Sequence, residues 1–281
     1  MPEQGRNYLR YRDEISGLDL SMSPHAVGLL SQVMGFDVSG PASDEQIYRS
    51  QRWIHGSSKR IFEKSLCQLF GYLGGRAMTK LAEKGIQRHD GLEGLVAIDV
   101  GFLGSDGPIM CPEIKIRTMV HKAAGLRESP FQHTSFLAGK GSDDPRVLSS
   151  RLAKILRRTA LDELPQPTYQ VPAGELAVVG ARGYTEPELT GTAILIESAQ
   201  NSRVELSDRA RDLLDTYRAK VDRYSPTPSM MGLLQATTSK ETPHLMRMYG
   251  DVVYWERATP LVDFRIVLYT VKQRALGVGA W

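Results

Sequence analysis

Three charged residues interrupt two apolar runs that follow one another in the sequence. Asp99 lies in the first run, 95–103, and Glu113 and Lys115 stand late in the second, 109–120. Glycine and aspartate between the runs are typical of a hairpin turn. Because Glu113 and Lys115 are two residues apart, their side chains would point to one face of a strand. Two carboxylates beside an ammonium would form an oxygen-rich site suited to Mg²⁺.

The pairing register of this hairpin decides whether the two acids meet. A regular turn at Gly104-Ser-Asp-Gly107 sets Asp99 opposite Pro112 and points Glu113 to the other face. Proline also cannot donate a hydrogen bond within a central strand. The site can form only through a loop of odd length or a one-residue bulge, and a bulge at Cys111-Pro112 would also accommodate the proline.

A helix is expected just upstream of the hairpin, at residues 57–84. Its apolar residues fall within one arc of a helical wheel, which predicts a face packed against a core. Glycines near its middle predict a kink or a close backbone contact. Glu63 lies at the border of the apolar arc, so its side chain can reach the edge of a sheet.

The helix and the hairpin together resemble the PD-(D/E)XK nuclease superfamily, which includes most type II restriction endonucleases. The residues that carry the resemblance are Gly56, Phe62, Glu63, Leu66, Asp99, Glu113 and Lys115. The resemblance implies a restriction-endonuclease-like core, in which helices flank a central mixed sheet. The mixed order of predicted helices and strands also favours an α/β fold around one sheet.

The resemblance implies hydrolysis of a DNA phosphodiester bond with Mg²⁺. Asp99, Glu113 and the carbonyl group of Ile114 would hold the metal, which polarises the phosphate and acidifies a bound water. Lys115 would position that water and offset charge in the transition state. Glu63 would hold a second metal or an outer-shell water.

The predicted function is therefore a Mg²⁺-dependent, sequence-specific endonuclease of double-stranded DNA. A homodimer is expected, because a cut through both strands at a symmetric site needs two active sites. One alternative is a structure-specific repair, recombination or phage nuclease with the same site. Another is a non-catalytic nucleic-acid-binding or structural protein, in which Glu113 and Lys115 form a surface ion pair.

A second contact with DNA is predicted on a helix at residues 146–163. Its basic residues occupy one arc of the helical wheel and its leucine and isoleucine residues another. A wholly basic face can lie along a phosphate backbone, although such a face can also serve only solubility. The predicted DNA-binding residues are Lys140, Arg151, Lys154, Arg157 and Arg158.

Composition limits the remaining classes of protein. The chain has 281 residues, of which 41% are hydrophobic and 24% charged, as in soluble globular proteins. Its net charge of +3 permits a nucleic-acid partner without requiring one. No apolar run approaches the roughly 18 residues of a membrane helix, and no secretory signal is visible. With only two cysteines, Cys67 and Cys111, a cytoplasmic protein without membrane contact is expected.

The remaining segments are assigned by their hydrophobic patterns. Residues 1–50 are expected to form an N-terminal lead-in with one short helix, and residues 51–281 a single nuclease domain whose C-terminal strands serve recognition or dimerisation. Rival acidic sites on those strands lack an acid-x-lysine motif, and the six histidines lack the spacing of zinc ligands. The rival pairs are Asp251 with Glu256 and Asp263 with Lys272. The remaining strands are expected at 175–180, 192–197, 252–257 and 264–272, and a charged helix at 208–224.

Overall fold

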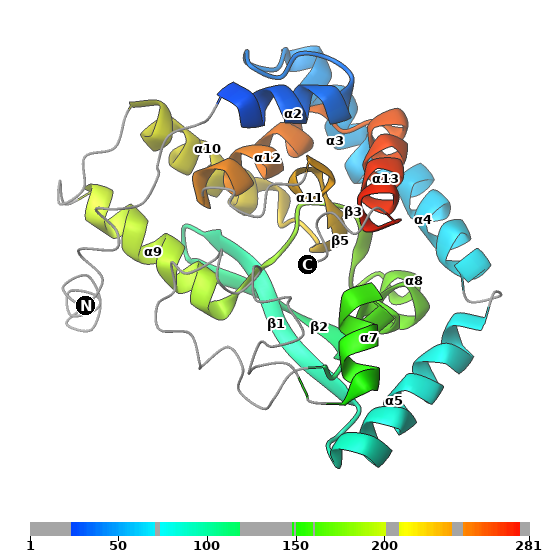
Figure 1. Cartoon of the computed structure of the whole chain (residues 1–281). Coiled ribbons are helices and arrows are strands. Elements are labelled where there is room, and N and C mark those ends of the chain that lie inside the picture. The colour runs from blue at the N-terminus through cyan, green and yellow to red at the C-terminus, as the bar shows by residue number, and fades with distance from the viewer. Residues whose placement is uncertain are drawn as a thin grey trace.

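The computed structural model describes residues 24–70, 74–118, 148, 150–159, 161–200, 208–237 and 244–275. These residues form a mixed α/β fold that is mostly helical and contains two small sheets (Figure 1). The helices are α2 (Pro24–Met34), α3 (Asp44–Ile54), α4 (Ser57–Phe70), α5 (Arg76–Asp90), α7 (Arg151–Thr159), α8 (Val171–Ala173), α9 (Glu186–Gln200), α10 (Asp208–Tyr224), α11 (Leu233–Thr237), α12 (His244–Arg257) and α13 (Pro260–Ala275). The strands are β1 (Leu95–Gly104), β2 (Gly107–Ile116), β3 (Ala177–Gly180), β4 (Tyr184–Thr185) and β5 (Ser229–Gly232), and two helical turns, η3 (Leu161–Glu163) and η4 (Gln166–Gln170), precede α8.

The strands divide into two sheets. Strand β1 lies between β2 and β4 in an antiparallel sheet, while β3 and β5 form a parallel pair. The predicted α/β class is confirmed. The single central mixed sheet of a restriction-endonuclease-like core is replaced by these two small sheets.

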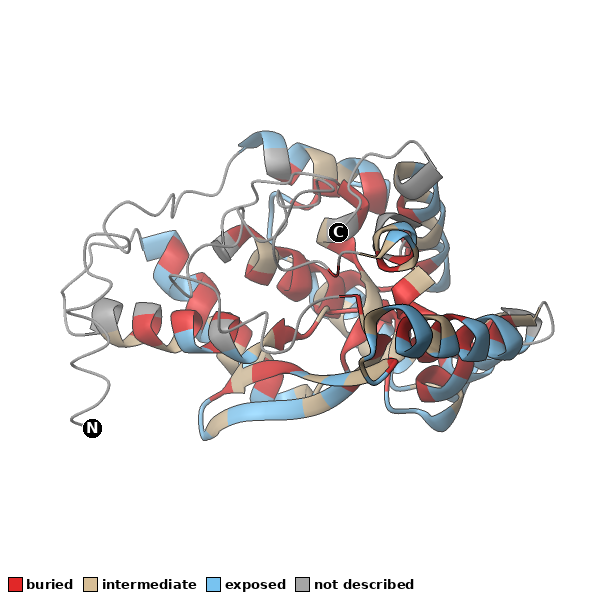
Figure 2. Ribbon diagram, turned by 60° about the horizontal axis from the view of Figure 1, so that its bottom comes forward, coloured by how far each residue is buried: buried red, intermediate tan, exposed pale blue. Residues whose placement is uncertain are grey.

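The β1–β2 hairpin is regular along its whole length. Asp99 pairs with Pro112 and Ile98 with Glu113, and the same register continues to the turn, so a bulge at Cys111-Pro112 is absent. The proline is tolerated because β2 is an edge strand of its sheet rather than a central one. One side of the hairpin is exposed along much of its length (Figure 2).

The helix expected at residues 57–84 is divided into α4 and α5, as its glycines predict. Gly74, just before α5, has a φ of 93°, in the left-handed region that favours glycine. Gly91 ends α5 in the same way, with a φ of 65° and its N–H bonded to the carbonyl of Gln87. The chain then turns directly into β1.

Three predicted strands, at 192–197, 252–257 and 264–272, are wrong, because these residues lie in α9, α12 and α13. In α12, four consecutive residues from Val252 to Trp255 are all buried, so the helical period is hidden. A short apolar run of this kind cannot be distinguished from a strand by its pattern. The strand at 175–180 and the helix at 208–224 are confirmed as β3 and α10.

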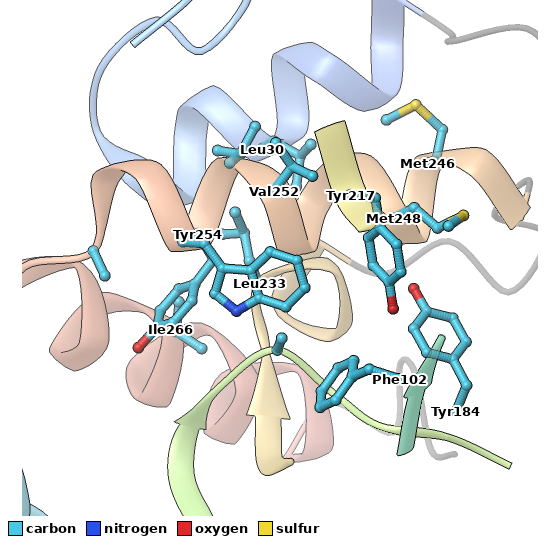
Figure 3. Close-up of a cluster of buried hydrophobic side chains, with 14 of the residues drawn as sticks. Leu30, Phe102, Tyr184, Tyr217, Leu233, Met246, Met248, Val252, Tyr254 and Ile266 are labelled. Carbon is cyan, nitrogen blue, oxygen red and sulfur yellow. The ribbon is translucent and has the colours of Figure 1, made fainter. Parts of the chain in front are cut away.

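The main core lies between the two sheets and the helices α2, α10, α11, α12 and α13 (Figure 3). Phe102 of β1 contacts the rings of Tyr184 and Trp255 edge-on, at centroid distances of 6.4 and 5.9 Å. Tyr217 of α10 packs against the same two rings. These aromatic contacts fix β1 and β4 against α10 and α12.

A second, smaller core fixes the other end of the hairpin. Ile86 of α5, Ile116 of β2 and Leu156 of α7 are almost fully buried in it. Leu164, which follows η3, completes this cluster. Because α7 packs into this second core, the η3 turn that follows it lies against β2.

Candidate active site

Two charged side chains of β2 are buried under the η3 and η4 turns. Glu113 is 6% exposed and Lys115 8% exposed. The Nζ atom of Lys115 lies 3.1 Å from Glu113 Oε2 and 3.3 Å from Glu163 Oε1. Buried charges are costly unless they are paired, and this lysine is paired on both sides.

The η3 turn adds two adjacent buried carboxylates. Asp162 is 2% exposed and Glu163 is 7% exposed. The hydroxyl of Thr118, just after β2, donates a hydrogen bond of 3.1 Å to Asp162 Oδ2. Glu163 faces Lys115, so the two acids of this turn have different surroundings.

Two glutamines of η4 attach the turn to β2. Gln166 Nε2 donates to Glu113 Oε1 at 2.9 Å. The side-chain amide of Gln170 accepts from the Ile114 N–H and donates to the Pro112 carbonyl, both at 2.7 Å, as a neighbouring strand would. The edge of β2 is thereby covered, and Glu113 is held in one orientation.

A further cation reaches this cluster from the segment after β3. The Nη2 atom of Arg182 lies 3.9 Å from Glu163 Oε1. The Arg182 side chain is 26% exposed, whereas that of Glu163 is almost fully buried. The cluster is therefore open to solvent on the side of Arg182.

The structure brings together only part of the predicted nuclease site. Glu113 and Lys115 are neighbours, as expected. Asp99 is exposed and, by its register opposite Pro112, lies on the other face of the hairpin. Ile114 pairs with Ala97 on β1, so it is not opposite Asp99, and its N–H donates to the side chain of Gln170.

Glu63 belongs to a different buried cluster. Its Oε1 atom accepts the N–H groups of Val178 and Val179 of β3 and lies 3.5 Å from Lys59 Nζ. Burial raises the pKa of the Glu63 carboxyl. Lys59 also binds Asp263 at 2.7 Å, so these charges join α4, β3 and α13. This arrangement is one of structural ion pairs.

No group of three or more His, Cys, Asp or Glu residues that could hold a metal occurs in the part of the chain that the structure describes. The predicted ligands Asp99 and Glu113 lie on opposite faces of the hairpin, and the structure does not bring them together with the Ile114 carbonyl or with Glu63.

The predicted DNA-binding helix corresponds to α7. Arg151 is exposed and Lys154 is half-buried. Lys140 lies outside the described residues, as do the side chains of Arg157 and Arg158. Of the apolar arc of the helix, Leu152 and Leu156 pack into the second core, whereas Ile155 is exposed.

The geometry of the cluster suits chemistry at a phosphate. Lys115 and Arg182 can offset negative charge on phosphoryl oxygens. The carboxylates of Asp162 and Glu163 can bind a divalent cation or attack phosphorus. Such a site can handle a phosphate or diphosphate group, whichever molecule carries it.

Comparison with known proteins identifies the class. Residues 109–277, more than half of the chain, match the family model of bacterial sugar transferases. The chain belongs to this family. The matched span contains all but the first two residues of β2, the η3 and η4 turns and Arg182, and thus the whole buried cluster described above.

Curated relatives agree with the family. The chain is 27% identical over 169 residues to the galactosyl transferase CpsE of Streptococcus agalactiae serotype III (strain NEM316), covering 59% of this chain and 32% of that protein. It is 29% identical over 133 residues to the UDP-galactose-lipid carrier transferase of Erwinia amylovora, covering 47% and 22%. It is 28% identical over 183 residues to the exopolysaccharide production protein PSS of Rhizobium leguminosarum bv. phaseoli, covering 60% and 78%. The chain thus spans less than a third of the length of the first two relatives.

These matches contradict the nuclease interpretation. The resemblance to PD-(D/E)XK nucleases is wrong, and with it the restriction endonuclease activity, the phosphodiester hydrolysis and the double-stranded DNA partner. An acid and an acid-x-lysine on a hairpin are short motifs, and here the lysine pairs with Glu163 instead of serving a metal shared with Asp99.

The expectation of a cytoplasmic protein without membrane contact is contradicted as well, by the match to bacterial sugar transferases and the similarity to a UDP-galactose-lipid carrier transferase. None of the described helices is long and apolar enough to cross a membrane.

Sequence reasoning missed the residues that complete the cluster. The predicted basic helix includes Asp162 and Glu163, yet α7 ends at Thr159 and these two acids lie in the η3 turn, just before Pro165. Two adjacent acids between a basic helix and a proline are a signal for a turn rather than for more helix. Arg182 and Thr118 lie in segments without a distinctive pattern, so only the fold reveals them.

Proposed function

We propose that this chain transfers a sugar phosphate from a nucleotide diphosphate sugar to a lipid phosphate, as the priming step of exopolysaccharide synthesis. The observation that carries the proposal is the buried Asp162-Glu163 pair beside Lys115 and Arg182, inside the span that matches the sugar transferase family. The names of the relatives, which include a lipid carrier transferase and an exopolysaccharide production protein, support the choice of substrates.

The proposed reaction exchanges one phosphorus–oxygen bond for another. An oxygen of the lipid phosphate becomes bonded to the β-phosphorus of the nucleotide sugar, and the bond from that phosphorus to the bridging oxygen breaks. The bridging oxygen leaves with the nucleoside monophosphate. The acceptor oxygen is already anionic, so the site needs no general base, but it must hold two negatively charged substrates together.

Lys115 and Arg182 supply the positive charge that this reaction requires. Preorganised cations at a phosphoryl group stabilise the charge that develops in the transition state. Lys115 is fixed between Glu113 and Glu163, so its ammonium group is already in place and needs little reorganisation during the reaction. Arg182 stands at the exposed side of the cluster, where a diphosphate can approach it.

Asp162 and Glu163 form a donor set that fits Mg²⁺. Proteins often hold this ion through one or two carboxylates together with substrate phosphates, and two adjacent carboxylates are present here. When bound, Mg²⁺ would neutralise charge on the diphosphate. The Asp162 carboxylate, which accepts from the neutral hydroxyl of Thr118, can also attack phosphorus as a nucleophile.

A surface formed by α5 and α7 fits the membrane in which a lipid acceptor resides. Its exposed apolar residues are Met78, Leu81 and Ile155. Gly85 of α5 has no room for a side chain, because a Cβ atom there would lie 2.3 Å from Leu152 Cδ2, so the two helices are in close contact. The exposed basic residues around this surface are Arg76, Lys80, Lys84, Arg88 and Arg151.

Apolar side chains surrounded by lysine and arginine are typical of helices that lie on anionic membranes. Helix α7 leads into η3 after one intervening residue, so this surface, which we call the α5–α7 surface, is close to Asp162 in the chain. A protein docked through it would have its active site near the lipid headgroups.

The test is a transfer assay with purified protein, a nucleotide sugar labelled at the β-phosphate, a polyprenyl phosphate and Mg²⁺. Label should move into the lipid fraction, and a chelator should stop the transfer. Asp162→Asn and Glu163→Gln should each lower the rate at least about a hundredfold, the usual loss for a group that acts on the transition state. Glu45→Gln, in an exposed ion pair with Arg49 on α3, is the matched control and should have the wild-type rate. Label that never reaches lipid with any nucleotide sugar would refute the function.

A further inference from the structure

A further buried carboxylate, that of Asp251, lies outside the cluster and near the segment that carries Arg182. Asp251 of α12 is 7% exposed. It accepts a hydrogen bond of 2.9 Å from the hydroxyl of Tyr184, and the backbone N–H of Arg182 also favours its charged form. One carboxylate is therefore linked to the chain at Tyr184 and interacts with it two residues earlier, at Arg182.

The segment between these two points has little freedom. Tyr184 and Thr185 pair with β1. A Cβ atom on Gly183 would lie 3.0 Å from Val100 Cγ2, so the backbone passes directly against β1. The placement of Arg182 relative to Glu163 thus depends on β1 on one side and on Asp251 on the other.

The charged and titratable groups around Asp251 come from several elements. Arg247 lies one turn earlier in α12, binds Glu188 of α9 at 2.9 Å and lies over the ring of Tyr184 at 4.6 Å. Tyr217 of α10 interacts with Asp251 as well, and burial together with the Asp251 carboxylate raises the pKa of the Tyr217 hydroxyl. Burial opposes the charged form of Asp251, whereas the Tyr184 hydroxyl, Arg247 and the Arg182 N–H favour it.

We propose that Asp251 is a positioning residue, whose negative charge holds the Arg182 backbone so that the guanidinium meets Glu163 and the substrate diphosphate. The inference rests on the proposed transfer reaction. Hydrogen bonds to a charged acceptor are about twice as strong as neutral ones, so neutralising Asp251 weakens both contacts at once. Arg182 then loses its fixed position, although Asp251 does not touch the substrate.

This role makes the reaction dependent on pH. Burial raises the pKa of the Asp251 carboxyl to about 7. The negative charge is therefore lost as the pH falls through neutrality, and the rate of transfer should fall with it. A purely structural carboxylate would affect the stability of the protein without producing this acidic limb of the pH–rate profile, which is the fall in rate below a pH of about 7.

The test compares the pH dependence of kcat/KM in the wild type and in Asp251→Asn, which has the same shape without the charge. The wild type should lose activity below a midpoint near 7. Asp251→Asn should be about tenfold slower at alkaline pH, equal to the wild type at acidic pH, and free of this limb. Asp222→Asn, which changes an exposed carboxylate on α10, is the control and should keep the limb. A limb that persists unchanged in Asp251→Asn would overturn the proposal.

A second variant serves if Asp251→Asn does not fold. Tyr184→Phe removes one hydrogen bond that lowers the pKa of Asp251, so the limb should move to higher pH. An unmoved limb in a folded Tyr184→Phe protein would contradict the proposal.

A measurement without substrate separates this inference from the function itself. The backbone amide signal of Arg182 in a ¹⁵N-labelled protein should shift with pH around a midpoint near 7, and should not do so in Asp251→Asn. If the wild type shows this shift but transfers no sugar phosphate, the proposed function fails while the contact between Asp251 and Arg182 stands. If the amide does not titrate, the positioning role is wrong even in an active enzyme.

Discussion

Lys115 of β2 lies 3.3 Å from Glu163 of η3, 48 residues later in the chain, and both side chains are buried. This ion pair joins the hairpin to the η3 turn, which also carries the carboxylate of Asp162. It also explains why an acid-x-lysine motif occurs on an edge strand. The lysine pairs with Glu113 and Glu163 together, so both carboxylates are compensated where the η3 turn packs on β2.

The first prediction concerns the stability that this pair provides. Lys115→Met keeps most of the volume of the side chain but leaves Glu113 and Glu163 without their shared cation. Breaking a buried ion pair by removing one partner costs about 3–5 kcal/mol, so the free energy of unfolding measured with urea should fall by that amount. Arg49→Met, which breaks an exposed ion pair on α3, should cost less than about 1 kcal/mol.

A double variant shows whether the loss comes from uncompensated charge. Adding Glu113→Gln to Lys115→Met removes one of the two stranded carboxylates, so part of the lost stability should return. Equal stabilities for the single and double variants would mean that packing, and not charge, accounts for the loss.

The second prediction separates two roles of Asp162. If its carboxylate attacks the β-phosphorus, a covalent acyl phosphate forms and nucleoside monophosphate leaves before the acceptor binds. We expect the wild type, without any lipid, to exchange labelled nucleoside monophosphate into the nucleotide sugar. Asp162→Asn should abolish this exchange. Transfer to lipid without exchange would instead assign direct attack by the acceptor, with Asp162 as a ligand of the metal.

The third prediction follows from the raised pKa of Asp251, about 7 in the folded protein against 3.8 for an ordinary aspartate. Between these values the folded protein binds more protons than the unfolded chain, so its stability falls as the pH rises. The slope approaches about 1.4 kcal/mol per pH unit within this window. Urea unfolding across the window should show a flatter slope for Asp251→Asn, and an identical slope would show that Asp251 titrates normally.

The hairpin and several helices could be predicted from the sequence because their signals are local. Two apolar runs and a turn with glycine and aspartate define β1 and β2, and glycines mark the break between α4 and α5. The helix α12 was predicted to be a strand because burial on nearly all sides removes its helical period, as Val252 to Trp255 show.

Only the part of the site that lies on β2 could be predicted from the sequence, because its signal is local. Glu113 and Lys115 are conspicuous because charges rarely interrupt an apolar strand. Their true partners, Glu163 and Arg182, come from segments that meet β2 only through the packing of α7 and the course of the chain after β3. No spacing along the chain encodes that meeting, and the acid that the sequence places nearest, Asp99, lies on the other face of the hairpin.

The last prediction tests the α5–α7 surface as a membrane contact. The protein should sediment with vesicles that contain anionic phospholipid, and much less with neutral vesicles, because each basic residue near an anionic surface contributes about 1 kcal/mol of attraction. Binding should weaken as salt rises, since the attraction is screened.

Two kinds of variant divide the apolar from the electrostatic part of this contact. Leu81→Glu places a charge at a residue that is 71% exposed, so it should abolish vesicle binding without unfolding the protein. Lys80→Glu with Lys84→Glu should reduce binding to anionic vesicles by at least about a hundredfold, since two attractions of about 1 kcal/mol each become repulsions. The matched control is Arg211→Glu with Arg223→Glu, which makes the same change of charge at exposed positions on α10. If the α10 control loses binding equally, the effect comes from the net charge of the protein and the α5–α7 surface is not the contact. If only the α5 variants lose binding, the membrane lies against α5 and α7, next to the η3 turn that carries Asp162.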